Sequence, residues 1–299
     1  MKVCYYSVAD FVFSVSIPDS VDAGRLLPSF RPFVCDGSGG QRLFDFVTTE
    51  LEQDSAALSS ADLLIEESLN DLGFVRLYSG PGGYLVSVAS APGGVTHFMR
   101  VDGGFSRPVA HIVWSDRMAG FVLSSMLRIV YSQAVLLHDA FSVHASAVYA
   151  DGKAFLFMGE SGTGKSTHAA LWLKHVPGCG LLNDDNPAVR VIGGVVKAYG
   201  TPWSGKTHCY KNLSFPVGGM VRLCQAPANR FMRREGAEAF IAVYPGCSAI
   251  TGDRRLSDCL CDTLVKVAEL VPVATLECLP DRHAALLCRN GLVNVDKEK

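Results

Sequence analysis

The sequence predicts an α/β protein in which a mainly β lobe precedes a domain with a mixed sheet. Two observations support this prediction. Apolar segments rich in branched and aromatic residues dominate residues 1–112, whereas residues 113–299 mix short strands with helical patterns. In the second part the strands are joined by short turns as often as by helices, which is typical of a mixed rather than a regularly parallel sheet.

The first lobe is expected to consist of strands and turns. Residues 48–59 are polar and fit either a short helix or a loop, and nothing in the lobe indicates catalysis, so it is interpreted as structural or substrate-shaping. A hairpin is expected around the turn at residues 79–83, because serine, glycine and proline gather there. The predicted strands cover residues 3–8, 11–16, 74–78, 84–88 and 96–101.

The second domain is expected to begin with a largely buried helix between residues 116 and 138. Further helices are predicted at residues 167–176, 256–270 and 281–288. The tryptophan of the loop at residues 200–206 is expected to be exposed. The predicted strands cover residues 141–149, 153–158, 180–182, 189–192, 195–199, 216–223 and 273–276.

A glycine-rich loop lies between the strand at 153–158 and the helix that follows, and it fits the phosphate-loop pattern GxxxxGK[ST]. Glycines let the backbone N–H groups turn around an anion, and the helix N-terminus adds positive potential. Lys165 is expected to reach the β- and γ-phosphates, and the Ser166 hydroxyl to bind Mg²⁺. The predicted nucleotide-binding residues are Gly159, Glu160, Ser161, Gly162, Thr163, Gly164, Lys165, Ser166 and Thr167.

Two acids follow the next apolar strand, at Asp184 and Asp185. Shortly after a phosphate loop, such a strand can place a carboxylate beside Mg²⁺, while a neighbouring acid faces the incoming nucleophile. The alternative is that both acids form the turn before Pro187. His144 lies on the strand expected to pair with the one that feeds the loop, which favours a place beside the phosphates, although a histidine there also fits a hydrogen-bonded core position.

Together these residues resemble the catalytic domain of the bacterial HPr kinase/phosphorylase family, whose fold is shared by ATP-dependent phosphoenolpyruvate carboxykinase. The resemblance covers about residues 134–200. It implies that Asp184 takes the proton of the hydroxyl being phosphorylated, that Asp185 helps Ser166 to bind the metal, and that His144 lies near Asp184. Family members form higher oligomers, so the resemblance also raises the prospect of a homo-oligomer.

The loop after the acids differs from the arginine–glycine loop of that family. Residues 201–206 resemble instead the smaller HPr-kinase-like proteins found beside peptide- and cofactor-modification genes. The acceptor is therefore left open among a small molecule, a peptide and a serine of an HPr-like protein. Lys206 and His208 are candidates for a cationic group opposite the phosphates, and a solvated loop is the alternative.

The function predicted from the sequence is an ATP- and Mg²⁺-dependent kinase that transfers the γ-phosphoryl group to a hydroxyl. The alternatives are a nucleotide-binding regulatory module without efficient catalysis and carboxykinase-like chemistry. The chain carries a net charge of −2 with scattered basic residues, so no nucleic-acid partner is expected.

No apolar run reaches the ~18 residues that a membrane span needs, so no membrane partner is expected. Asp10 interrupts any signal-peptide core. The ten cysteines show no CxxC pair. They are interpreted as reduced thiols of a cytoplasmic protein.

Overall fold

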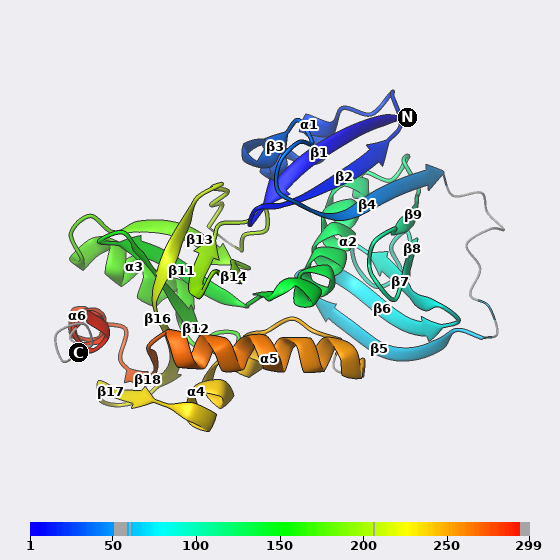
Figure 1. Cartoon of the computed structure of the whole chain (residues 1–299). Helices are drawn as coiled ribbons and strands as arrows, with labels where there is room; N and C mark the ends of the chain where they lie inside the picture. Colours follow the sequence, from blue (N-terminus) through cyan, green and yellow to red (C-terminus); the bar gives the residue numbers. More distant parts are fainter. Residues whose placement is uncertain (51–58, 60, 206, 251, 294–299) are drawn as a thin grey trace. The chain divides into compact units, whose positions relative to one another are not determined.

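The computed structural model describes residues 1–50, 59, 61–205, 207–250 and 252–293. The chain consists of two compact units, Met1–Ala134 and Val135–Lys299. Each unit contains a mixed sheet, which confirms the mixed α/β class. The sequence analysis placed the boundary at residue 112, before the long helix. In the structure helix α2 (Ala119–Ala134) belongs to the first unit, because its apolar side packs on strands β4 and β7 there (Figure 1).

The sheet of the first unit has the order β3-β1-β2-β4-β9-β8-β7-β6-β5. Strand β4 pairs in parallel with β2 and β9, and the other pairs are antiparallel. Its elements are β1 (Lys2–Val8), β2 (Phe11–Ile17), α1 (Ala23–Leu26), η1 (Pro28–Phe33), β3 (Val34–Cys35), β4 (Gln41–Glu50), β5 (Leu63–Asn70), β6 (Gly73–Gly80), β7 (Gly83–Ala89), β8 (His97–Asp102) and β9 (Val109–Ile112).

The five strands expected in this unit are all present, and the predicted hairpin is β6–β7. The polar stretch at 48–59 is different. Its first residues end strand β4, where Thr48 is buried and hydrogen bonds to the Ser16 carbonyl, and residues 51–58 lie outside the described part of the chain.

The second unit holds the glycine-rich loop and the acids. The sheet runs β10-β14-β15-β16-β12-β11-β13, and β18 pairs with both β16 and β17. Its elements are η2 (Val135–His138), β10 (Ala140–Ser142), β11 (Ala145–Ala150), β12 (Lys153–Met158), α3 (Lys165–His175), β13 (Gly180–Asp185), β14 (Ala188–Ile192), β15 (Val195–Tyr199), β16 (Ser214–Gln225), β17 (Arg230–Arg234), α4 (Gly236–Val243), η3 (Tyr244–Gly246), α5 (Arg254–Leu270), β18 (Val273–Cys278) and α6 (Arg282–Val293).

One predicted strand, at 141–149, is two strands in the structure. Strand β10 pairs with β14, whereas β11 pairs with β12 and β13, so the chain changes neighbours at Val143 and His144. His144 therefore lies between two strands rather than within one. The backbone N–H of His144 donates to the Gly246 carbonyl at 2.7 Å. This hydrogen bond holds the backbone at the point where the chain leaves one strand and begins the next.

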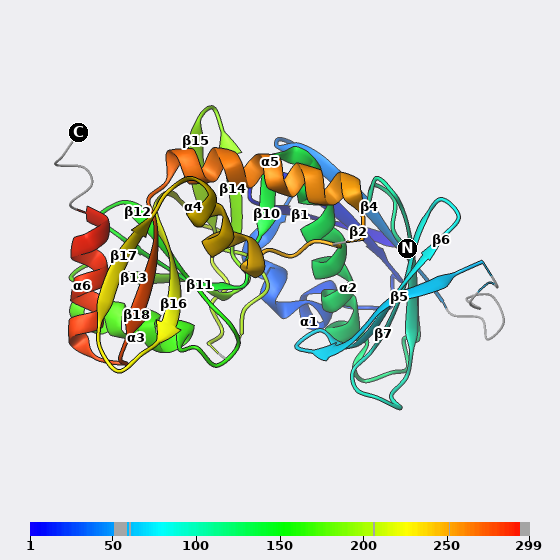
Figure 2. The ribbon, with the colours of Figure 1, turned by 90° about the horizontal axis from the view of Figure 1, so that it is seen from below.

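Helices α3 and α6 pack against each other and against the sheet of the second unit (Figure 2). Trp172 of α3 is fully buried between them, with its ring centroid 4.9 Å from that of Phe155 and 5.3 Å from that of Phe157. Strand β12 and helix α3 are therefore joined by a solid aromatic contact, and the loop that connects them has two rigid ends.

One helical segment, Ala119–His138, is long and apolar enough to cross a membrane, with a hydropathy of 1.5 over its most apolar window. This differs from the expectation that no apolar run reaches such a length: polar residues such as Arg128 and Gln133 lie within the segment, yet its mean hydropathy is high enough. In the structure 67% of this window is buried, as in a core helix.

Candidate active site

The glycine-rich loop predicted to bind phosphate connects the end of β12 at Met158 to the start of α3 at Lys165. Gly164 is the N-cap of α3 and has a φ of 103°, in the region that favours glycine. Gly159 has a φ of 149°, and a Cβ there would come within 3.1 Å of the Leu223 carbonyl oxygen. Both glycines are therefore required by the backbone path, and the path leaves the first N–H groups of α3 without helical partners, ready to bind an anion.

Lys165 is almost fully buried and lies across the loop. Its ammonium group donates to the carbonyl oxygens of Gly159 at 2.9 Å and Glu160 at 3.0 Å. Burial lowers the pKa of Lys165, and the negative charges of Asp185 and Asp184 oppose that shift. The cation is thus held inside the loop, in the place where phosphate oxygens would replace the two carbonyls.

Ser166 meets the first of the two acids. Its hydroxyl donates to Asp184 Oδ1 at 2.9 Å, and the Ser146 hydroxyl of β11 donates to the same oxygen at 2.5 Å. Asp184 is 3% exposed, and Ser146 is its direct partner across the β11–β13 ladder. Two hydroxyl donors therefore hold a buried carboxylate beside the start of α3.

Asp185 has different neighbours. His144 Nδ1 lies 3.0 Å from Asp185 Oδ1, and the His144 side chain is 42% exposed. The φ of Asp185 is 151°, a strained value for a residue with a side chain, and such strain gathers at functional sites. Since successive residues of a strand point to opposite faces, the two acids cannot share one set of partners.

These contacts correct one expectation. The family resemblance implied a pairing of Ser166 with Asp185 and of His144 with Asp184, whereas the structure pairs Ser166 with Asp184 and His144 with Asp185. The acids also lie inside strand β13 rather than in a turn after it. The strand extends this far because β11 pairs with it along its length, and that pairing cannot be recognised from local sequence.

The segment after the hairpin β14–β15 is hydrogen bonded to Asn183 and to the backbone of Asp184. Asn183 is fully buried, and its side-chain N–H groups donate to the carbonyl oxygens of Thr201 and Trp203 and to the Thr201 hydroxyl. The Gly205 N–H and the Ser204 hydroxyl both donate to the Asp184 carbonyl. The Trp203 side chain is 5% exposed, so the expectation of an exposed tryptophan is wrong: the loop folds onto the strand through these bonds.

The two candidates for an outer cation have different outcomes. Lys206 lies outside the described residues. His208 is exposed and stacks on Tyr210, with the ring centroids 5.9 Å apart. The structure thus brings the loop, Asp184, Asp185 and His144 together in one region, and leaves His208 at the surface with an aromatic neighbour.

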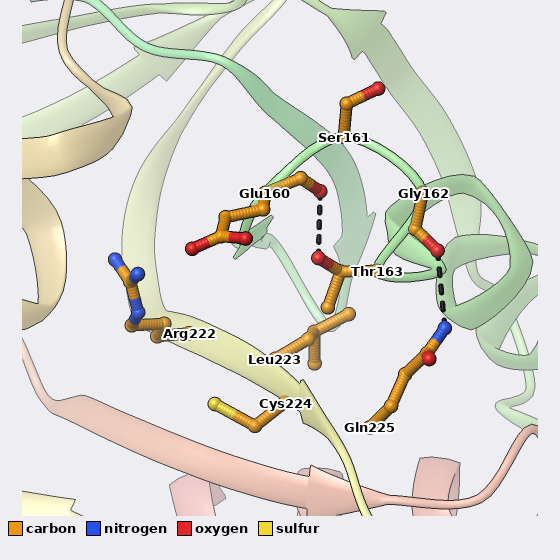
Figure 3. Close-up of a pocket in the computed structure, with 8 residues that line it drawn as sticks. All are labelled: Glu160, Ser161, Gly162, Thr163, Arg222, Leu223, Cys224 and Gln225. Carbon is orange, nitrogen blue, oxygen red and sulfur yellow. Dashed lines mark hydrogen bonds between the residues drawn. The ribbon is translucent and has the colours of Figure 1, made fainter.

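Three residues that the sequence analysis missed belong to this region. Ser146 binds Asp184, and Arg222 and Gln225 of β16 line a cavity of about 380 Å³ together with loop residues 160–163 (Figure 3). Gln225 donates to the Gly162 carbonyl at 3.1 Å. None of the three carries a local sequence signal, because strand pairing places them. Ser146 is positioned by the pairing of β11 with β12 and β13, and Arg222 and Gln225 by the pairing of β16 with β12.

The oxygen donors at Ser166 and Asp184 fit Mg²⁺ rather than a metal that prefers sulfur or nitrogen. Among the described residues no group of three or more His, Cys, Asp and Glu side chains could hold a metal ion. Mg²⁺ sites in phosphate-transferring proteins commonly use one or two protein oxygens and complete their coordination with phosphate oxygens and water. The residues present therefore fit such a site.

Comparisons with known proteins gave matches among solved structures. A scan against protein-family models and a search of curated proteins found no match. Among solved structures the chain is similar to the Hpr(Ser) kinase/phosphatase from Coxiella burnetii, at 16% sequence identity and a TM-score of 0.33. The match covers 52% of this chain and 93% of that chain.

Proposed function

We propose that the second unit is a phosphotransferase that uses ATP and Mg²⁺ to phosphorylate a hydroxyl group. The observation that carries this proposal is the convergence of the buried Asp184 carboxylate with the Ser166 hydroxyl at the end of the phosphate loop. A glycine-rich turn could arise without function, but a buried acid that is hydrogen bonded to this serine is the arrangement that metal-assisted phosphoryl transfer requires.

Each part of the site has a physical role in this proposal. The loop N–H groups and Lys165 bind and orient the triphosphate. Ser166 and Asp184 hold Mg²⁺, which when bound neutralises charge on the phosphate oxygens. Ser146 fixes the Asp184 carboxylate from the opposite side. Most of the rate enhancement would come from positioning and charge stabilisation.

Asp185 is proposed as the proton acceptor, which reverses the roles that the family resemblance implied. The acceptor oxygen forms a bond to the γ-phosphorus, and the bond to the bridging oxygen of ADP breaks with its electron pair. The proton of the hydroxyl passes to Asp185. His144, paired with Asp185 and half exposed, provides a route from that carboxylate to solvent.

The fold type proposed for this unit is that of the HPr kinase and phosphoenolpyruvate carboxykinase domains. Its support is the order His144, phosphate loop and acid pair along the chain. The acceptor is proposed to be a small molecule, a peptide or a protein serine. Ser204, in the loop that differs from the HPr kinase pattern, bridges to Asp185 and donates to the Asp184 carbonyl, which supports a role for this loop in selecting the acceptor.

A transfer assay tests the proposal. The protein is incubated with γ-labelled ATP, Mg²⁺ and a panel of hydroxyl-bearing small molecules, ribosomally made peptides and HPr. We expect label in one acceptor, and a ~10²-fold or larger loss of transfer in Asp185→Asn with ATP binding retained. Asp151→Asn, which changes an exposed acid, is the matched control. ATP binding without transfer to any acceptor would instead support a nucleotide-binding regulatory module.

A further inference from the structure

A second cavity lies beside the glycine-rich loop and shares Gly162, Thr163 and Gln225 with the cavity in Figure 3. Its volume is about 430 Å³, within the range of small-molecule sites. Residues of the loop, the start of α3 and the ends of β16 and β18 line it. The residues used below are Thr167, Leu171, Gln225, Ala226, Leu279 and Pro280.

Gln225 separates the two cavities. Its side chain lines both, and its hydrogen bond to the Gly162 carbonyl joins the end of β16 to the tip of the loop. The first cavity meets the loop only at residues 160–163, and the second continues to Gly164 and Thr167. The second cavity is therefore lined by the residues on either side of Lys165 and Ser166, where the phosphates are proposed to bind.

The strand order separates the second cavity from the two acids, where phosphoryl transfer is proposed to occur. The order β13-β11-β12-β16, with β18 beside β16, puts the acids on one side of β12 and the cavity on the other. A triphosphate held by the loop with its γ-phosphoryl group toward the acids would extend its other end toward β16 and β18. Both cavities lie on that side, because residues of β16 line each of them, so the chemistry of their walls has to distinguish them.

The walls of the two cavities differ in chemistry. The first contains the charged side chains of Glu160 and Arg222, which both point into it (Figure 3). The second has apolar walls from Leu171, Ala226, Leu279 and Pro280, with polar groups at Thr167 and Gln225. Thr163 and His168 add further polar groups. Apolar walls with a few polar groups suit an aromatic ring system that carries hydrogen-bonding groups on its rim.

We propose that the second cavity binds the nucleoside of the triphosphate, with the base between the Leu171 side of α3 and the segment at Ala226, Leu279 and Pro280. This inference rests on the proposed function, since it needs a nucleotide in the loop. It goes beyond that function by assigning the residues that distinguish a nucleotide from a plain polyphosphate.

The test compares the binding of ATP with that of inorganic tripolyphosphate, both with Mg²⁺, by isothermal titration calorimetry. Ala226→Trp fills the second cavity, and Cys224→Trp fills the first as the matched control. Leu279→Trp, at a 39% exposed position on the rim, provides a second variant should Ala226→Trp fail to fold. Thermal unfolding shows which variants are folded.

We expect the cavity-filling variants at Ala226 or Leu279 to weaken ATP binding by about ten-fold or more and to change tripolyphosphate binding by less than about two-fold. Cys224→Trp should leave the ratio of the two affinities unchanged. An unchanged ratio at Ala226 and Leu279, or a selective loss of ATP binding in Cys224→Trp, would overturn the nucleoside assignment alone. If the wild-type protein binds neither ligand, the proposed function itself is wrong.

Discussion

At the residue scale, the hydrogen-bond partners of the two acids distinguish their proposed roles. Asp184 and Asp185 are neighbours in sequence, yet one accepts hydrogen bonds from two serine hydroxyls and the other pairs with a histidine. The sequence predicted that both acids and His144 belong to one site. The resemblance implied the opposite partners for the two acids, because the pairing depends on the register of β11 against β13, which local sequence does not show.

Lys165 is the cation on which triphosphate binding should depend most if the proposed function is correct. It bonds to two loop carbonyls, and bound phosphates would replace those carbonyls. Because a hydrogen bond to a charged group contributes about 1.5–3 kcal/mol, Lys165→Ala should weaken ATP binding by at least about ten-fold. Calorimetric titration measures the affinity. Lys174→Ala, at an exposed position of the same helix, should bind ATP like the wild type, and equal affinities of the two variants would contradict this role.

Ser146 is expected to affect Mg²⁺ binding indirectly, by holding the Asp184 carboxylate in place. In Ser146→Ala the buried carboxylate loses one of its two hydroxyl donors, so the Mg²⁺ concentration for half-maximal ATP binding should rise about ten-fold. Ser142→Ala is the control, since the Ser142 hydroxyl is equally buried and makes no hydrogen bond to any described residue. A matching rise in both variants would show a general loss of packing and not a role in positioning Asp184.

At the scale of elements, the sequence predicted β12 and α3 well because both carry clear apolar patterns and stop signals. It missed the split between β10 and β11, because the apolar run at 141–149 continues unbroken while the chain changes pairing partners. It also missed β17 and α4, whose positions depend on packing against β18 and α5 rather than on strong local signals.

The junction of β12 and α3 makes a prediction about stability. Trp172 is fully buried against Phe155 and Phe157, so Trp172→Ala should lower the free energy of unfolding by about 3–5 kcal/mol. Denaturation in urea measures the change. Leu173→Ala alters the next residue, which is 40% exposed, and should cost much less. A cost for Leu173→Ala as large as that for Trp172→Ala would mean that helix content, and not the aromatic contact, holds α3 in place.

Helix α3 also carries a buried histidine whose titration should affect stability. Burial lowers the pKa of His168 to about 4, and His168 Nε2 accepts a hydrogen bond from Trp172 Nε1 at 3.1 Å. Between pH 6.5 and about 4 the unfolded chain therefore binds a proton that the folded chain does not, so stability falls as the pH falls through this range.

His168→Gln should remove this part of the pH dependence, which amounts to about 3 kcal/mol over the full range. Urea denaturation of the protein without nucleotide or metal, at pH 7 and pH 4.5, measures it. His175→Gln, at the end of the same helix, is the control. If the wild type and His168→Gln lose the same stability on acidification, His168 is not the group responsible.

For the whole molecule, composition and pattern predicted a mainly β part and a mixed α/β part, and the structure has both. The boundary is different because the apolar face of α2 packs on the first sheet, and an apolar face does not reveal from sequence which sheet covers it. The site could be predicted as far as the loop and its acids, which are local motifs. Ser146, Arg222 and Gln225 could not, since strands distant in sequence bring them there.

The most direct test of the account is the position of metal and phosphates in a crystal of the protein with Mn²⁺ and a non-hydrolysable ATP analogue. The anomalous signal should place Mn²⁺ ~2 Å from the Ser166 hydroxyl oxygen and from an Asp184 carboxylate oxygen, the distance expected when oxygen coordinates Mg²⁺-like ions. The β- and γ-phosphates should replace the loop carbonyls at Lys165. Phosphates bound away from the loop, or a metal remote from both Ser166 and Asp184, would contradict it.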